Sequence, residues 1–289
     1  MYQKTFKHAT LWGLLWRSFF ALVGVVNLTT ILFLAFGQDH SPIIRTLSDS
    51  LLYFLVYKII ISLMKKQSLS IRSVAKSDPK KWNELFKISS WTFLTAVVAT
   101  SFSVFLLTVI SFLPNVYELI IPYIEELAAE EDIPHVYLFV VAVIVAPIVE
   151  EIIFRGYIMN KWIDKYSLKK GIFYSSFLFM LFHVQSFFIP QLLLGLLCAL
   201  VYVKFNNLFY AIFTHSLYNL LVILPVFLIP DNGDIAVDTL LTLSEELPTY
   251  YLIFSAIFII GLLIILFLFI KIFRSTKDQS SPYVENLMQ

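Results

Sequence analysis

The sequence predicts an all-α polytopic membrane protein with about eight transmembrane helices. Hydrophobic residues make up 59% of the chain and charged residues only 14%, whereas soluble domains carry roughly one quarter charged residues. The mean hydropathy is +0.81. Apolar stretches of roughly 20 residues, the length of a helix that crosses the bilayer, recur along the whole chain. The lipid bilayer is therefore the expected environment of most of the protein.

The apolar stretches can be placed in order between charged connections. We expect spans at 14–37, 43–64, 88–113, 135–159, 171–189, 190–205, 207–229 and 249–271. The first stretch is long and lacks a small-residue cleavage site, so it is expected to stay as an anchor and not to be a signal peptide. Residues 1–277 are expected to form a single transmembrane domain, followed by a disordered cytoplasmic tail at 278–289.

Basic residues cluster in alternate connections, and this sets the expected orientation. They lie in the second, fourth and sixth connections and after the last span, at Lys65, Lys66, Arg72, Lys76, Lys80, Lys81, Lys87, Lys161, Lys165, Lys169, Lys170, Lys204, Lys271, Arg274 and Lys277. By the positive-inside rule these segments face the cytoplasm, so both termini are expected there. The third and seventh connections are acidic. The net charge of +1 averages two faces of opposite sign, and it gives no indication of nucleic-acid binding.

Glu150, Glu151 and Arg155 place charge inside an otherwise apolar span. Such groups are costly at membrane depth unless partners or water receive them, which makes them candidates for a functional site. Glu151 and Arg155 are four residues apart and share a helical face, in the order that favours an ion pair. Glu150 points about 100° away, so we expect it to carry the chemistry. Pro147 lacks an N–H, frees the carbonyl of Val143, and is expected to bend the helix.

Two further motifs supply histidines at the same helical spacing. His183 follows Phe179 by four residues, and His215 precedes Asn219 by four. We expect the ring of Phe179 to stack beside His183 and to fix its orientation. His215 and Asn219 share a face, from which they can present hydrogen-bond donors to a developing oxyanion. Each pair alone is also consistent with a structural contact, but three motifs on three helices favour a shared cavity.

Together these three motifs resemble the signatures of a known family. The run from Ala146 to Gly156 contains EExxxR, and it is followed by FxxxH at 179–183 and HxxxN at 215–219. These are the signatures of the CaaX protease and bacteriocin-processing family (CPBP, or Abi) of intramembrane endopeptidases, and they occur here in order and without a mismatch. The resemblance covers about residues 135–225. The set of three is specific, whereas EExxxR alone is a weak signal.

The resemblance implies a peptidase whose helices surround a cavity open to the cytoplasmic leaflet. It implies that Glu150 activates water and that His183 helps to hold this water. His215 and Asn219 are implied to stabilise the oxyanion. The implied location is a cell membrane, most directly a bacterial one.

The resemblance also implies supporting residues and a class of substrate. Glu151 and Arg155 correspond to the supporting pair, with Phe179 beside the histidine. The expected substrate is a membrane-associated peptide or a lipidated or membrane protein, because relatives trim prenylated CaaX proteins or act in peptide maturation and bacteriocin immunity. Two alternatives stay open. One is a catalytically silent immunity or scaffold protein of the same family, and the other is a proton-coupled transporter that uses the same groups as a relay.

The chemistry of the motifs leaves one further alternative, a metal site. Glu150, His183 and His215 form a two-histidine, one-carboxylate set of the kind that can bind zinc with a water in the open position. Asn219 suits oxyanion stabilisation better than ligation, so we favour water activated by Glu150 without an obligatory metal. The sequence has no HExxH motif, which excludes zincin-type proteolysis.

Overall fold

The computed structural model describes residues 6, 9–37, 41–75, 81–111, 113, 139–183, 188–228 and 233–288. In these segments the chain forms helices and no strand, which confirms the all-α fold class. The long helices are α1 (Leu11–Phe36), α2 (Ser41–Lys66), α4 (Trp82–Ser111), α10 (Phe188–Phe205), α11 (Leu208–Leu228) and α12 (Gly233–Thr276). The predicted acidic third connection lies outside the described residues.

Five of the described helices are long and apolar enough to cross a membrane, and they comprise Leu11–Phe36, Ile43–Lys66, Trp82–Ile110, Phe188–Phe205 and Tyr251–Thr276. A polytopic membrane fold is therefore confirmed, while the count of eight spans stays a prediction. One predicted span and one predicted connection differ from the structure. The fifth, expected at 171–189, is α9 (Leu168–Leu181), which has only 14 residues. The seventh connection, expected as a loop, is helical from Gly233 onward.

The fourth predicted span is helical but changes its register along its length. It runs through the π-helix η3 (Phe139–Val145), α7 (Ala146–Glu151), the π-helix η4 (Ile152–Met159) and α8 (Asn160–Lys165). π-turns of this kind are rare and occur frequently at functional sites. The segment with the EExxxR motif therefore has the least regular backbone among the described helices.

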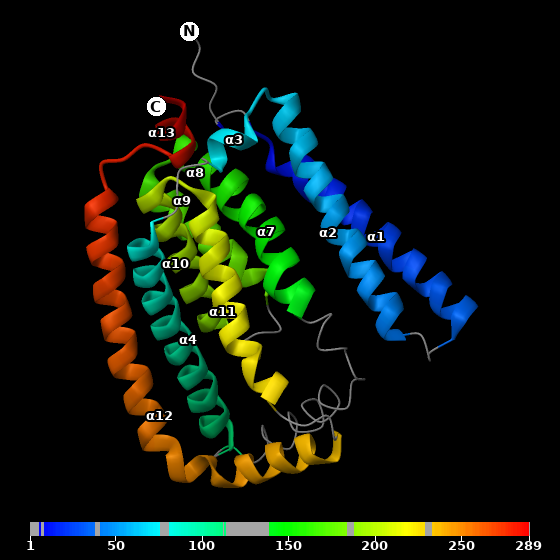
Figure 1. The fold of residues 1–289 in the computed structure, drawn as a ribbon, viewed down its shortest axis with the longest axis vertical. Helices are drawn as coiled ribbons and strands as arrows, with labels where there is room; N and C mark the ends of the chain where they lie inside the picture. The colour runs from blue at the N-terminus through cyan, green and yellow to red at the C-terminus, as the bar shows by residue number, and fades with distance from the viewer. Residues whose placement is uncertain are drawn as a thin grey trace.

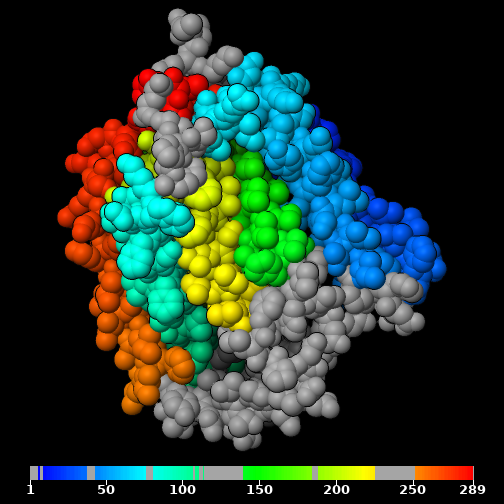
Figure 2. Space-filling view, viewed as in Figure 1, coloured from blue at the N-terminus to red at the C-terminus, as the bar shows by residue number. Residues whose placement is uncertain are grey.

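The helices form a bundle with a hairpin at one side (Figure 1). α12 packs along α4, and α10 packs between α9 and α11. α1 and α2 pair with each other and diverge from the bundle, and in Figure 2 they project from the side opposite α12. α10 forms the centre of the core, because its residues from Leu197 to Val203 are almost fully buried.

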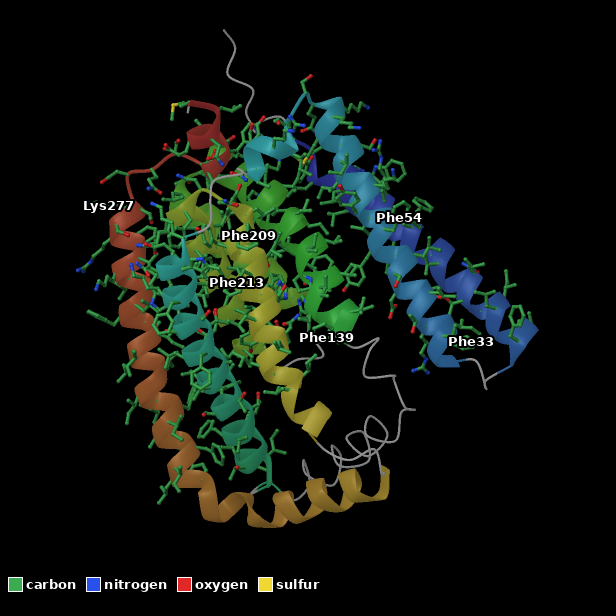
Figure 3. The ribbon with its side chains drawn as sticks, in the orientation of Figure 1. Phe33, Phe54, Phe139, Phe209, Phe213 and Lys277 are labelled. Carbon is green, nitrogen blue, oxygen red and sulfur yellow. The ribbon has the colours of Figure 1, made fainter. Side chains whose placement is uncertain are left out.

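Apolar side chains cover the outside of the helices, as expected for contact with lipid. Phe54 on α2 and Phe209 on α11 are 54% and 37% exposed, and Figure 3 shows both on the outer surface of the ribbon. Lys277 lies just beyond α12, near the end of the molecule where α13 is found (Figure 3). The long apolar helices thus end in polar segments at this end of the bundle.

The two ends of the chain meet α3 (Ile71–Val74) and α8 in a small cap (Figure 1). The Phe6 N–H donates to Asp164 Oδ2 at 2.8 Å, and the rings of Phe6 and Tyr283 pack edge to face at 4.9 Å. The Tyr283 N–H donates to Asn160 Oδ1 at 3.3 Å, and the Ser70 N–H donates to the Tyr283 hydroxyl at 3.2 Å. Both termini are therefore anchored at the same end of the bundle.

The C-terminal tail differs from the sequence prediction. Instead of a disordered segment at 278–289, the structure has the helix α13 (Pro282–Met288), in which Tyr283 is fully buried. Glu285 accepts hydrogen bonds from the Ser280 N–H and hydroxyl at 3.0 and 2.8 Å. A helix this short is stabilised by packing more than by propensity, so the polar composition of the segment did not predict that it would be helical. Proline at the first helical position was the signal that could have identified it.

Candidate active site

Glu151 and Arg155 form a buried ion pair, as their spacing predicted. Arg155 Nη1 lies 2.8 Å from Glu151 Oε1, and both side chains are inaccessible to solvent. Arg155 Nη2 also donates to the carbonyl of Gly195 on α10 at 2.9 Å. Its guanidinium lies 4.7 Å from the ring centre of Phe179. The pair therefore connects the EExxxR helix to both α9 and α10.

Glu151 has a second partner that sequence reasoning did not predict. His215 Nδ1 lies 2.9 Å from the same Oε1 atom, and the two residues are 64 positions apart in the chain. The carboxylate can only accept, so Nδ1 of His215 carries a hydrogen. Glu151 thus fixes the imidazole of His215 as well as Arg155.

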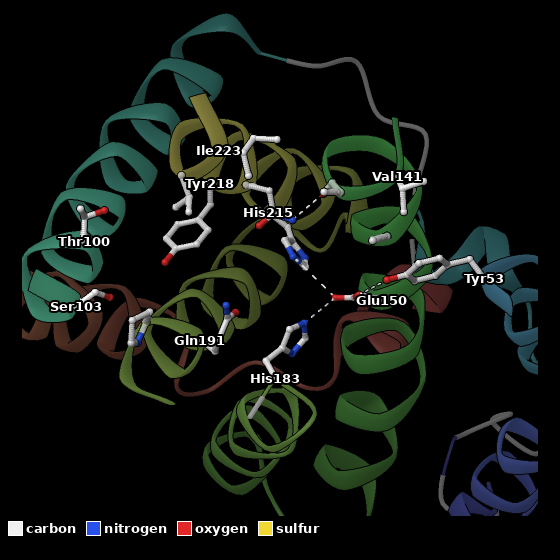
Figure 4. A pocket seen from close by; sticks show the side chains of 15 residues that line it. Tyr53, Thr100, Ser103, Val141, Glu150, His183, Gln191, His215, Tyr218 and Ile223 are labelled. Atoms are coloured by element: carbon white, nitrogen blue, oxygen red, sulfur yellow. Dashed lines mark hydrogen bonds and ion pairs between the residues drawn. The ribbon is translucent and has the colours of Figure 1, made fainter. Parts of the chain in front are cut away.

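Glu150 lies between Tyr53 on one side and the two histidines on the other (Figure 4). Its Oε1 accepts a hydrogen bond from the Tyr53 hydroxyl at 3.1 Å. Its Oε2 is buried, has no hydrogen bond among the described residues, and lies 3.6 Å from His183 Nε2 and 3.9 Å from His215 Nε2. The structure thus brings together the acid and both histidines of the three motifs.

The hydrogen bonds on the far side of each imidazole determine what faces Glu150. His183 Nδ1 lies 2.8 Å from the carbonyl oxygen of Phe179, which can only accept, so this nitrogen also carries a hydrogen. The Phe179 ring packs against the imidazole with a centroid distance of 4.3 Å, as expected. In their neutral forms, His183 and His215 therefore both direct a lone pair at Glu150 Oε2. Three acceptors face one another, and such an arrangement requires a donor between them, which a water molecule or an added proton supplies.

Asn219 bonds to a backbone carbonyl at the point where the EExxxR segment changes from π-helix to α-helix. Its Nδ2 donates to the carbonyl of Ala142 at 2.7 Å. In a π-helix the N–H of residue i+5 bonds to the carbonyl of residue i, so the N–H that Pro147 lacks would have served Ala142. The prediction that Pro147 frees the carbonyl of Val143 assumed α-helical register, whereas the carbonyl that Asn219 satisfies is that of Ala142. One amide hydrogen of Asn219 is used in this way, and the amide has a second.

Two cavities meet at Glu150. One, of about 400 Å³, is lined by Tyr53, Glu150, His183, His215 and Asn219. The other, of about 750 Å³, lies between the α1–α2 hairpin and the bundle and is mainly apolar. Tyr53, Glu150 and His183 line both. Sequence reasoning did not identify Tyr53, because a tyrosine hydroxyl in an apolar span was the only signal and α2 contains two tyrosines.

The zinc alternative can be compared with this arrangement. Glu150, His183 and His215 have the donor atoms that catalytic zinc sites use. Among the described residues, however, no group of three His, Cys, Asp or Glu side chains is arranged to hold a metal ion. The residues present therefore do not fit a metal in this conformation, and we derive no step through one.

Comparison with known proteins agrees with the motifs. Residues 132–221 match the family model described as type II CAAX prenyl endopeptidase Rce1-like. This segment contains all three motifs, and the resemblance to the CaaX protease and bacteriocin-processing family is thereby confirmed. A comparison with curated proteins finds no match, and a comparison with solved structures finds none.

Proposed function

We propose that this protein is an intramembrane endopeptidase that hydrolyses a peptide bond in a membrane-associated peptide or protein. The observation that carries the proposal is the set of three acceptors, Glu150 Oε2 and the Nε2 atoms of neutral His183 and His215, which converge in a cavity where no described residue places a donor between them. A water placed among them donates its two hydrogens to Glu150 and His183. This is the arrangement that general-base activation of water needs.

In the proposed first step Glu150 removes a proton from this water. The water oxygen forms a bond to the scissile carbonyl carbon, and the carbonyl oxygen becomes an oxyanion. His215 donates to this oxygen through Nε2 when its ring is protonated, and Glu151 supports the resulting positive charge through Nδ1. The second amide hydrogen of Asn219 is the other proposed donor.

In the second step the proton on Glu150 is transferred to the amide nitrogen as the carbon–nitrogen bond breaks. The carbonyl product leaves as a carboxylic acid that still carries the second proton of the water, and this proton passes to the amine, which gives a carboxylate and an ammonium group. One water is consumed for each bond cleaved.

The substrate proposal rests on the second cavity and on the family description. The apolar cavity of about 750 Å³ borders Glu150 and His183, so an apolar segment or a lipid chain bound there would bring an adjacent peptide bond to the base. The matching family model is described by its action on CAAX prenyl substrates. We therefore propose a lipidated or strongly apolar peptide as the substrate class.

The test is cleavage by purified Glu150→Gln protein in detergent, with quenched fluorescent peptides that end in a CaaX sequence, with and without a farnesyl group. We expect kcat to fall by about 10²- to 10⁴-fold, the usual contribution of a general base, because the amide cannot take a proton. Glu84→Gln, on an exposed part of α4, is the matched control and should cleave normally. Substantial turnover by Glu150→Gln would exclude Glu150 as the base.

The same assay separates the alternatives. Cleavage by metal-free protein in the presence of a chelator is expected to continue. Activity that is lost with chelator and restored by stoichiometric zinc would instead require a metal mechanism. Proton-coupled flux in liposomes without any cleavage would indicate a transporter, and a wild-type protein inert in both assays would indicate an immunity or scaffold role.

A further inference from the structure

We propose that Tyr53 is a positioning residue for Glu150, and that the α1–α2 hairpin belongs to the active site through this tyrosine. The inference rests on the proposed role of Glu150 as the base. It adds a residue from outside the segment that matches the family model, which covers 132–221, and from a helix that carries none of the three motifs.

The first support is that the two oxygens of Glu150 face different partners. Oε1 accepts from the Tyr53 hydroxyl at 3.1 Å, while Oε2 faces His183 and His215. The terminal torsion of glutamate is broad and roughly two-fold, so the carboxylate needs an external contact to select one orientation. The Tyr53 hydroxyl supplies this contact, and it leaves Oε2 available for water.

The second support is the way in which the hairpin is attached to the bundle. Near the cap, Nε2 of Gln67, the residue directly after α2, donates to the Tyr157 hydroxyl at 3.2 Å, and this hydroxyl donates to the Thr10 carbonyl at 3.4 Å. Away from this end, α2 packs on the bundle mainly through η3 and α7, and the hairpin diverges from the other helices (Figure 1). The Tyr53–Glu150 bond is thus a polar link between the diverging hairpin and the site.

The third support is the position of the apolar cavity. Its walls are Leu15, Phe19 and Leu52 from the hairpin, and Ile153 and Phe182 from the bundle. A movement of α2 away from α7 would widen this cavity and lengthen the contact between Tyr53 and Glu150. An occupant of the cavity would consequently influence the orientation of the base.

The experiment needs no substrate, because it follows the protonation of Glu150 directly. The infrared carbonyl band of a protonated glutamic acid is titrated in purified protein, and the band that Glu150→Gln removes is assigned to Glu150. In Tyr53→Phe the carboxylate loses a donor that stabilises its charged form, so we expect the band to appear at a higher pH. The other ionisable groups near Glu150, namely His183, His215, Glu151 and Arg155, are unchanged in this variant.

Tyr57→Phe is the matched control, since Tyr57 is one turn further along α2 and is also partly buried. Its Glu150 titration should match that of the wild type. In the cleavage assay, Tyr53→Phe should lower kcat about tenfold with little change in KM. An unchanged Glu150 band in Tyr53→Phe would overturn the inference.

The outcomes also distinguish the inference from the proposed function. If Glu150→Gln is inactive while Tyr53→Phe matches the wild type in titration and turnover, the proposed function stands and the role of Tyr53 is wrong. If Glu150→Gln cleaves normally, the proposed function is wrong, although the titration still reports whether Tyr53 orients this carboxylate.

Discussion

One oxygen of Glu151 has two buried partners, so we expect this residue to contribute mainly to the stability of the fold. Oε1 accepts from Arg155 Nη1 at 2.8 Å and from His215 Nδ1 at 2.9 Å. Loss of the carboxylate leaves a guanidinium without its counter-charge inside the membrane domain. Removal of one partner from a buried pair is costly, because the remaining charge stays desolvated.

We therefore expect Glu151→Gln to destabilise the protein by about 3–5 kcal/mol. Thermal unfolding in detergent should show a clearly lower midpoint than the wild type. Glu84→Gln is the control at an exposed pair, where Glu84 lies 3.3 Å from Lys87 and 56% of the lysine side chain is accessible. Exposed pairs contribute only about 0–1 kcal/mol, so equal midpoints for the two variants would contradict a structural role for Glu151.

At the scale of elements, the break in the EExxxR segment explains where Asn219 lies. The π-helical turns of η3 meet α7 at Pro147, and the carbonyl of Ala142 is satisfied by the side chain of Asn219 on α11. The contact is partly buried, and it links α11 to the helix that carries Glu150. The same bond fixes the Asn219 amide in the orientation in which its second hydrogen is proposed to donate to the oxyanion.

A double-mutant cycle tests this link. Asn219→Ala alone should cost about 1–3 kcal/mol, because it leaves the Ala142 carbonyl unsatisfied. In a Pro147→Ala background the new N–H can serve that carbonyl, so the cost of Asn219→Ala should be smaller by about 1 kcal/mol. Chemical unfolding in detergent measures both values. The control is Asn27→Ala, whose amide bonds to the Val23 carbonyl on exposed α1, and additive effects at Asn219 would argue against the link.

At the scale of the whole molecule, the sequence predicted the contacts that lie within one helical turn. The Glu151–Arg155 pair and the packing of Phe179 on His183 follow from a spacing of four residues. Contacts between distant segments were not predictable in the same way, since Tyr53 and Glu150 are 97 residues apart. The register change at Ala142 was missed because periodicity arguments assume α-helical turns, and α13 was missed because tertiary packing stabilises it.

Orientation is a property of the whole molecule that rests on the sequence alone. The basic connections predict that the cap formed by the two termini, α3 and α8 faces the cytoplasm. Cys198 is the single cysteine of the chain and is fully buried, so the wild type should give no labelling background. Cysteines can therefore be introduced one at a time without removing it.

An impermeant thiol reagent applied to intact cells should label Phe36→Cys, because residue 36 is exposed where α1 ends at the predicted outer face. Lys169→Cys, exposed next to the cap, should resist the reagent until the cells are permeabilised. The reverse pattern would place the cap outside. In that case the segment that carries Glu150 would run through the membrane in the opposite direction, and a substrate held in the cytoplasmic leaflet would approach the base from the other end of the hairpin.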